Sequence, residues 1–173
     1  MGPHFVLKIN LTINDWDGGW RNIYHVTDGI NQGGGNKNGN FGSTGDRYPF
    51  LALNSEKLIF ISEKNGQTDP RDLQYAADLN TKYKIEVHQI NVDGTTMYEI
   101  FIDDVEKVSV ENNSPIIVEN AMVYLAANFI DVGDATVEYF YLESYYCNNG
   151  FYWNKMTSSC GGKLIFSQTC HQK

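Results

Sequence analysis

Asp and Glu account for 21 of the 173 residues, so paired carboxylates are the first chemistry to consider. Hydrolysis of a glycosidic bond uses two carboxyl groups that face each other across the bond, roughly 5–10 Å apart. The best candidates are Glu138 with Glu143, and Asp103-Asp104 with Glu106. Residues five apart lie on opposite faces of an unbroken strand, and an Asp-Asp pair is typical of a turn. We therefore predict no catalytic residues and a protein that is not an enzyme.

Two short acidic segments carry the oxygen ligands that Ca²⁺ prefers. Asp15 and Asp17 belong to the first segment, and Asp131 and Asp134 belong to the second. If both segments lie at the same end of the fold, they could share one Ca²⁺ ion. The alternative is that the Asp and Asn side chains only form turns, through hydrogen bonds to nearby backbone. Ca²⁺ is the one cofactor for which we single out ligands.

The three cysteines, Cys147, Cys160 and Cys170, all lie late in the chain. Their spacing lacks the Cys-x-x-Cys pair of zinc sites, which favours disulfide bonds over a metal site. The odd number leaves one cysteine to pair with another chain or with a partner beyond Lys173, and the pairing stays open. Because disulfides persist in oxidising compartments, we expect a secreted or cell-surface protein.

Aromatic and polar side chains are expected to flank one and the same loop region. Trp16, Trp20 and Tyr48 are the candidate aromatic contacts of a ligand, and Asp46 and Arg47 are the candidate polar contacts. Sugars stack on exposed aromatic rings, while nearby polar groups fix the hydroxyls. The alternatives are that the aromatic residues pack in the core or at its rim, and that Asp46 and Arg47 form a structural pair.

Two sequons for N-glycosylation are present, at Asn10 and Asn112. Strand alternation places Asn10 on an outward face, whereas Pro115 follows directly after the second sequon and weakens it. Glycosylation of both sites is consistent with an extracellular glycoprotein.

The net charge of −8 disfavours a polyanionic partner such as nucleic acid. Lysine and arginine are scattered along the chain with no run of them. The longest apolar runs have the length of strands, so we expect no insertion into a membrane.

Alternation of apolar and polar residues over residues 5–13 predicts a strand with one buried face. The other predicted strands are residues 20–27, 48–53, 58–62, 83–91, 97–103, 105–110, 117–127 and 135–144. Residues 28–46 are rich in Gly and Asn and predict a long loop, while residues 72–79 could hold a short helical turn. Roughly ten short strands indicate an all-β, antiparallel, two-sheet β-sandwich.

Composition changes near residue 145, which we take as a domain boundary. Residues 1–4 are expected to be an added start or a linker, and residues 5–144 are expected to form the sandwich. Residues 145–173 are expected to be a short disulfide-bearing tail, a fragment of a further Cys-rich module.

Several segments in order resemble the laminin-G-like branch of the concanavalin-A-like lectin/glucanase superfamily. They are Trp20–Thr27, Gly45–Phe50, Tyr83–Ile85 with Val87 and Gln89, Tyr98–Asp103, and Ala121–Tyr124. The resemblance covers about four fifths of the chain and implies a jelly roll that recognises glycans or proteins outside the cell, in some members with loop-bound calcium. The tail resembles Cys-rich repeats of extracellular and protist surface proteins.

Three functions are compatible with these features. The first is an extracellular recognition or adhesion module that binds a glycan or a protein through loops 14–19, 28–47 and 131–134 at one end of the sandwich. The second is a structural unit of a surface or fibre-forming protein, which self-assembles through a sheet edge or the tail. The third, a glucanase-type hydrolase, lacks the paired carboxylates.

Overall fold

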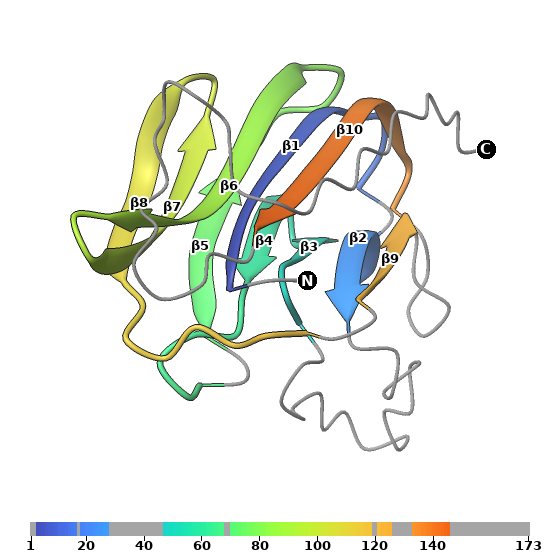
Figure 1. The fold of residues 1–173 in the computed structure, drawn as a ribbon. Coiled ribbons are helices and arrows are strands. Elements are labelled where there is room, and N and C mark those ends of the chain that lie inside the picture. The colour runs from blue at the N-terminus through green and yellow to red at the C-terminus, as the bar shows by residue number, and fades with distance from the viewer. Residues whose placement is uncertain are drawn as a thin grey trace.

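The computed structural model describes residues 3–16, 18–27, 47–67, 70–118, 121–125 and 133–145. The described residues form two antiparallel sheets of five strands, stacked as two layers (Figure 1). Sheet A has the order β10-β1-β6-β7-β8, and sheet B has the order β5-β4-β3-β2-β9. The strands are β1 (His4–Ile13), β2 (Arg21–Thr27), β3 (Phe50–Asn54), β4 (Lys57–Ile61), β5 (Arg71–Ala76), β6 (Lys82–Val92), β7 (Thr95–Ile102), β8 (Val105–Glu111), β9 (Met122–Leu125) and β10 (Ala135–Tyr145). The predicted all-β, two-sheet sandwich is confirmed.

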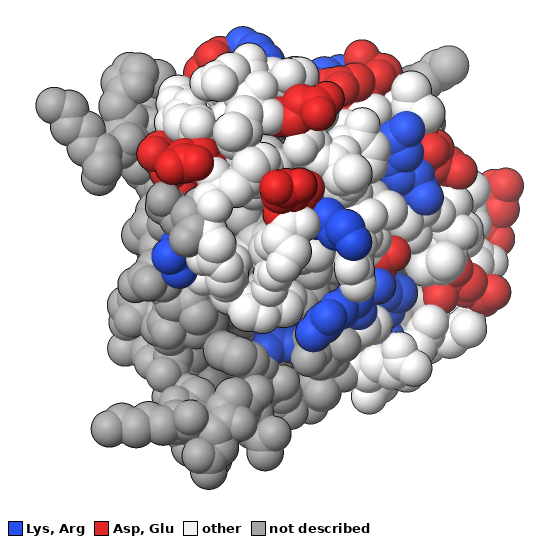
Figure 2. Space-filling view, turned by 180° about the vertical axis from the view of Figure 1, so that it is seen from behind, with Lys and Arg blue, Asp and Glu red and all other residues white. Residues whose placement is uncertain are grey.

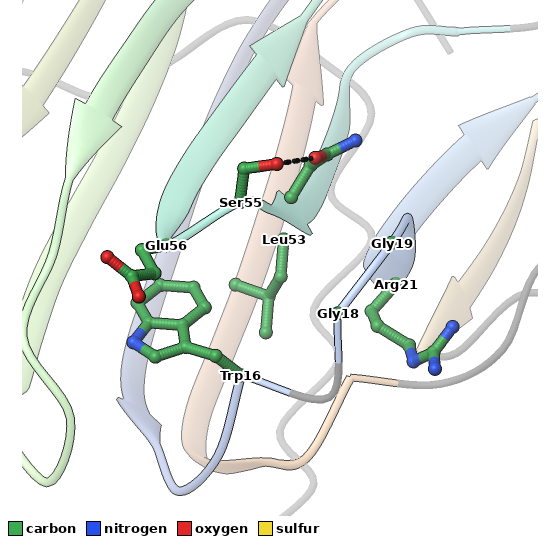
Figure 3. A pocket seen from close by; sticks show the side chains of 8 residues that line it. Trp16, Gly18, Gly19, Arg21, Leu53, Ser55 and Glu56 are labelled. Atoms are coloured by element: carbon green, nitrogen blue, oxygen red, sulfur yellow. Dashed lines mark hydrogen bonds between the residues drawn. The ribbon is translucent and has the colours of Figure 1, made fainter.

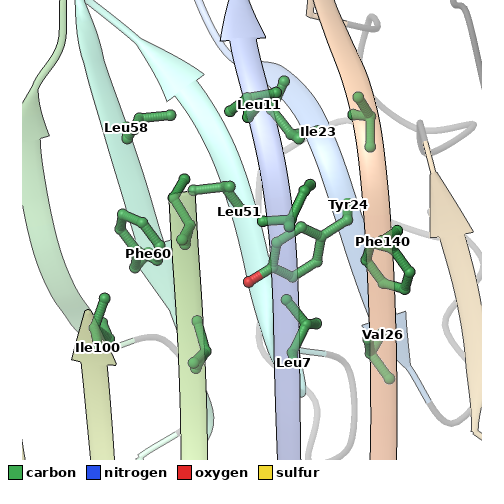
Figure 4. Packing of buried hydrophobic residues seen from close by; sticks show 14 of the residues in the cluster. Leu7, Leu11, Ile23, Tyr24, Val26, Leu51, Leu58, Phe60, Ile100 and Phe140 are labelled. Atoms are coloured by element: carbon green, nitrogen blue, oxygen red, sulfur yellow. The ribbon is translucent and has the colours of Figure 1, made fainter. Parts of the chain in front are cut away.

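The hydrophobic core lies between the two sheets (Figure 4). Strand β1 shows why: its alternate residues are all fully buried and face sheet B, while the residues between them face outward. Tyr24 and Val26 of β2 pack against this row from the other sheet. The core therefore follows from the period-two pattern of the central strands.

Sheet B is apolar on both faces over its central strands. Phe50 and Ala52 of β3, with Ile59 and Ile61 of β4, form a second buried cluster on the face turned away from the core. Trp20 packs against this cluster. The continuous apolar runs of β3 and β4 reflect this burial on both sides.

Three hairpins close through two-residue turns in which both central residues have positive φ. These pairs are Ser55-Glu56, Asp93-Gly94 and Asp103-Asp104. Such turns match the twist of the flanking strands. The predicted turns at residues 92–95 and 103–104 are confirmed.

Two predicted elements differ from the structure. Residues 71–76 form strand β5 instead of a helical turn, because they pair with β4 along its whole length. Within residues 117–127, only the four residues of β9 are a strand among those described, and residues 115–118 have no regular structure. No helix that could span a membrane is found among the described residues.

The antiparallel strands define two ends of the sandwich, which we name the Trp16 end and the Tyr48 end. At the Trp16 end β1 finishes and β2 begins, and the backbone N–H groups of Asn14 and Asp15 donate to the carbonyl of Asp134. At the Tyr48 end β2 finishes, and Tyr48 bonds to Val26 through its backbone. Of the loops 14–19, 28–47 and 131–134 that are predicted to share one end, residues 17, 28–46 and 131–132 lie outside the described residues. Thr27 and Arg47, which flank residues 28–46, lie at the end opposite to residues 14–16.

Candidate functional site

The Tyr48 end is closed by a buried polar network. Gln89 Nε2 donates to the Tyr48 hydroxyl and to the carbonyl of Pro3, both at 2.6 Å. Asn112 Nδ2 donates to Gln89 Oε1 at 2.7 Å. Burial raises the pKa of the Tyr48 hydroxyl, so this group remains protonated.

This network corrects the expectation that Tyr48 and Arg47 contact a ligand. Tyr48 is 0 % exposed and Arg47 is 5 % exposed, so neither side chain offers a surface on which a sugar could stack. The Tyr48 ring instead packs edge-on against Phe5, at 5.2 Å between ring centroids. Their role is structural, while Asp46 lies outside the described residues.

The two sequons also differ in accessibility. Asn112 is 1 % exposed, and its Oδ1 accepts from the backbone N–H groups of Asn65 and Ser114. A glycan cannot be attached to this amide in the folded protein, which corrects the prediction at Asn112. Asn10 lies on the outer face of β1, paired with Tyr139 and Lys84, and its glycosylation stays a prediction.

The Trp16 end contains an open pocket of about 180 Å³. Trp16 and Glu56 lie on one side, Arg21 lies on the other, and Leu53 lies between them (Figure 3). Asn54 and Ser55 complete the rim from the β3–β4 turn. The pocket thus combines an aromatic ring and an aliphatic side chain with carboxylate, amide, hydroxyl and guanidinium groups.

Hydrogen bonds hold the loop that carries Trp16. The backbone N–H groups of Asn14 and Asp15 donate to the carbonyl of Asp134 at 2.9 and 3.3 Å. Asn14 Nδ2 donates to Asp134 Oδ1 at 3.0 Å, and the backbone N–H of Trp16 donates to Asp15 Oδ1 at 2.7 Å. Trp16 itself is partly buried against the main core. The ring is therefore held in position, with part of its surface open to the pocket.

The same bonds bear on the predicted Ca²⁺ site. Asp15 and Asp134 do lie at one end, but each carboxylate already accepts a hydrogen bond from the protein, as in the turn alternative. Among the residues that the structure describes, no three His, Cys, Asp or Glu side chains are grouped as metal ligands. Asp17 and Asp131 lie outside the described residues, as do Cys147, Cys160 and Cys170.

The β3–β4 turn on the rim has an unusual residue choice. Ser55 has φ of 49° and Glu56 has φ of 63°, a region that costs L-residues energy and that Asn, Asp and Gly tolerate best. Every other described residue with positive φ is Asn, Asp or Gly. Glu56 is exposed, and its carboxylate has no hydrogen bond or ion pair within the described structure. The turn therefore presents a free carboxylate at some cost in backbone energy.

Arg21 forms the opposite wall at the first position of β2. Its Nη1 donates to the carbonyl of Trp20 at 3.2 Å, which holds the guanidinium beside the pocket. Trp20 itself lies elsewhere: Arg71 stacks over its ring at 5.2 Å, and it covers the second cluster of sheet B. The three predicted aromatic contacts, Trp16, Trp20 and Tyr48, are therefore separated, and only Trp16 lines the pocket.

The carboxylates considered for catalysis are not paired. A bulge in β10 leaves Glu138 between Val137 and Tyr139, so Glu138 and Glu143 share the outer face instead of lying on opposite faces. They are still four to five strand positions apart, ~13–16 Å at ~3.3 Å per residue, too far for a glycosidase pair. Glu138 pairs with Lys82, and Glu143 accepts from the Tyr141 hydroxyl.

Charge on the outer face of sheet A centres on Glu86. Its carboxylate lies 2.9 Å from Lys8 Nζ and 3.0 Å from His88 Nε2. Lys84 Nζ lies 3.2 Å from the other oxygen. Burial alone raises the pKa of Glu86, but the hydrogen bonds from these three neighbours lower it to about 2. On the opposite side of the molecule, basic and acidic side chains are interspersed over the described surface (Figure 2).

Sequence reasoning missed Arg21, Leu53 and the β3–β4 turn. One signal was present: Asn-Ser-Glu-Lys at residues 54–57 separates two apolar runs, yet the turn residues are not the Asn, Asp or Gly that such hairpins prefer. A two-residue turn with unfavourable residues stores backbone strain, and such strain clusters at functional sites.

No protein-family model matches the chain, and no curated protein matches it. Among solved structures, the chain is similar to sheep galectin-11 in complex with glycerol. The sequence identity is 10%, the match covers 82% of this chain and 91% of that chain, and the TM-score is 0.46. The likeness concerns the arrangement of the strands alone.

Proposed function

We propose that this domain is a lectin-like module that binds carbohydrate in the pocket at the Trp16 end. The observation that carries the proposal is the open Trp16 ring beside the free Glu56 carboxylate, in a pocket whose floor is apolar. The C–H face of a sugar ring stacks on an aromatic side chain, while the hydroxyls need polar partners.

The polar rim suits a ring that carries neutral hydroxyls. A guanidinium only donates hydrogen bonds and an ionised carboxylate only accepts them, so Arg21 and Glu56 demand opposite roles of their ligand. A hydroxyl fills both roles. Ser55 Oγ donates to Asn54 Oδ1 at 2.6 Å, so the Ser55 oxygen can accept from a ligand while the Asn54 amide N–H groups can donate to it.

We also propose that the protein is extracellular. It is supported by the outward sequon at Asn10 and by the late cysteines. The partner is then a glycan on another molecule, and adhesion is the role that follows from it.

Self-assembly of a structural unit through a sheet edge would need an edge strand open to pairing. Strand β8 at the edge of sheet A carries Glu106, Lys107 and Glu111, all exposed. Charged edge strands resist pairing with a second copy. This edge therefore favours a binding module over self-assembly through β8.

The test is titration of the full chain with a panel of neutral monosaccharides and oligosaccharides, followed by NMR of the tryptophan indole signals. We expect at least one sugar to shift the Trp16 signal, and Glu56→Gln to weaken its binding by about tenfold or more. Glu106→Gln makes the same chemical change at an exposed site on β8 and should leave the affinity unchanged. Sugar binding that is equally strong in Glu56→Gln would rule out this pocket.

A further inference from the structure

The size of the pocket restricts what it can hold. Its volume of about 180 Å³ lies below the roughly 300–1,000 Å³ of pockets that enclose drug-sized ligands. We infer that the pocket binds one sugar ring at the end of a glycan chain and excludes rings within a chain. This inference rests on the proposed function and adds its ligand class.

The walls support binding at a chain end. Leu53, at the floor, is 2 % exposed and belongs to the main core, so the pocket does not continue through the sandwich. Trp16 bounds one side and Arg21 lines the facing side, with its guanidinium turned away from Leu53 (Figure 3). A ring within a chain is linked to neighbours on two sides and needs two exits. A terminal ring needs only one.

Space beside Gly18 provides one exit. Gly18 lines the pocket, and a Cβ atom added at this position would meet no atom within 4 Å. The neighbouring position is less open, because a Cβ atom added at Gly19 would lie 3.9 Å from Arg21 Nη1. The glycan chain would therefore leave past Gly18, where it gains few further contacts with the described surface.

Three probes on the full chain test the inference, with affinities measured by NMR titration. The first is the monosaccharide that binds best. The second is an oligosaccharide that carries the same sugar at its non-reducing end, and the third is one that carries it only within the chain. We expect the first two dissociation constants to agree within about tenfold, and the third probe to bind at least about tenfold more weakly than the second.

The outcomes separate the two claims. If the internal sugar binds as tightly as the terminal one, the chain-end inference is overturned, while carbohydrate binding stands. If no probe binds, both are overturned.

A variant at the exit gives a second readout. Gly18 has φ of +66°, which Asn tolerates better than most residues, so Gly18→Asn adds a side chain with little backbone strain. We expect Gly18→Asn to weaken binding of the oligosaccharide that carries the sugar at its non-reducing end more than binding of the monosaccharide. Equal effects on both would contradict an exit at Gly18.

Discussion

The two ends of the sandwich use polar side chains in opposite ways. At the Tyr48 end, Tyr48, Gln89 and Asn112 are buried and bond to one another. At the Trp16 end, Glu56 is exposed, has no partner within the described structure, and sits in a turn with unfavourable φ. Buried groups that satisfy each other hold a fold together, whereas open groups on strained backbone are available to a ligand.

The comparison also explains why aromatic content alone is a poor guide to a site. Tyr48 and Trp16 are both large aromatic residues beside polar neighbours in the sequence. Tyr48 is buried and bonds to Gln89. The loop of Trp16 is instead held by bonds of its backbone and of Asp15, so the Trp16 ring need not be buried to be fixed in position.

The largest expected effect is at the closed end. Gln89→Leu removes the hydrogen bonds that Gln89 makes to the buried Tyr48 hydroxyl, the buried Asn112 amide and the partly buried Pro3 carbonyl. We expect the free energy of unfolding to fall by about 3–5 kcal/mol, measured from urea denaturation.

Gln74→Leu is the matched control, because Gln74 is exposed on β5 and should change stability by less than about 0.5 kcal/mol. Sugar affinity of folded Gln89→Leu should be unchanged. A loss of stability no greater than that of the control would contradict the structural role of the network.

At the open end the expected effect is on affinity. Trp16→Ala removes the stacking surface, so the dissociation constant for the bound sugar should rise at least about tenfold in the same titration. Stability should fall by only about 1–2 kcal/mol, because the ring is partly buried.

Trp20→Ala is the control that distinguishes the loss of sugar stacking at Trp16 from the loss of stability that removal of any tryptophan causes. Trp20 covers the second cluster and does not line the pocket, so its loss should lower stability while the affinity stays within about twofold. An equal loss of affinity in both variants would mean that Trp16 acts through the fold.

The sequence was a good guide where structure is local. The alternation in β1 predicted both its length and its buried face, and Asp93-Gly94 predicted a hairpin. Both depend on neighbours along the chain. Residues 72–79 were predicted less well because β5 owes its extended form to pairing with β4, which overrides local preference.

The pocket could be predicted only in part. Trp16 was singled out from its type and its loop, whereas Arg21, Leu53 and Glu56 come to it through the order of strands in sheet B. Tyr48 was misplaced because its burial depends on Gln89, which lies 41 residues away in sequence. Contacts of this range leave no local pattern.

A smaller effect is expected from relieving the turn at the open end. Glu56→Gly removes the penalty of a positive φ, so the free energy of unfolding should rise by about 0.5–1 kcal/mol in thermal denaturation. Sugar affinity should fall at the same time, because the carboxylate is gone. Higher stability together with lower affinity would show that Glu56 lowers the stability of the turn and favours binding.

Asp104→Gly is the control for this variant, since Asp104 has the same φ of 63° in the β7–β8 turn. Asp tolerates this region better than Glu, and Asp104 pairs with Lys84, so we expect no gain in stability. If Glu56→Gly destabilises the protein, the turn is not strained and the contrast between the two ends is weaker.

The smallest expected effect is on the pH dependence of stability, and it concerns Glu86, a polar group that has partners but lies near the surface. Because its folded pKa of about 2 lies below the usual 4.5, Glu86 contributes stability above pH 4.5 and loses it as the pH falls towards 2. Glu86→Gln should therefore reduce the loss of stability over this window, by less than about 1 kcal/mol, in urea denaturation at pH 2.5 and 6. Glu106→Gln, at an exposed position on β8, should leave the pH dependence unchanged. If the two variants behave alike, the interactions around Glu86 add nothing to stability, and burial is what makes the Tyr48 network effective.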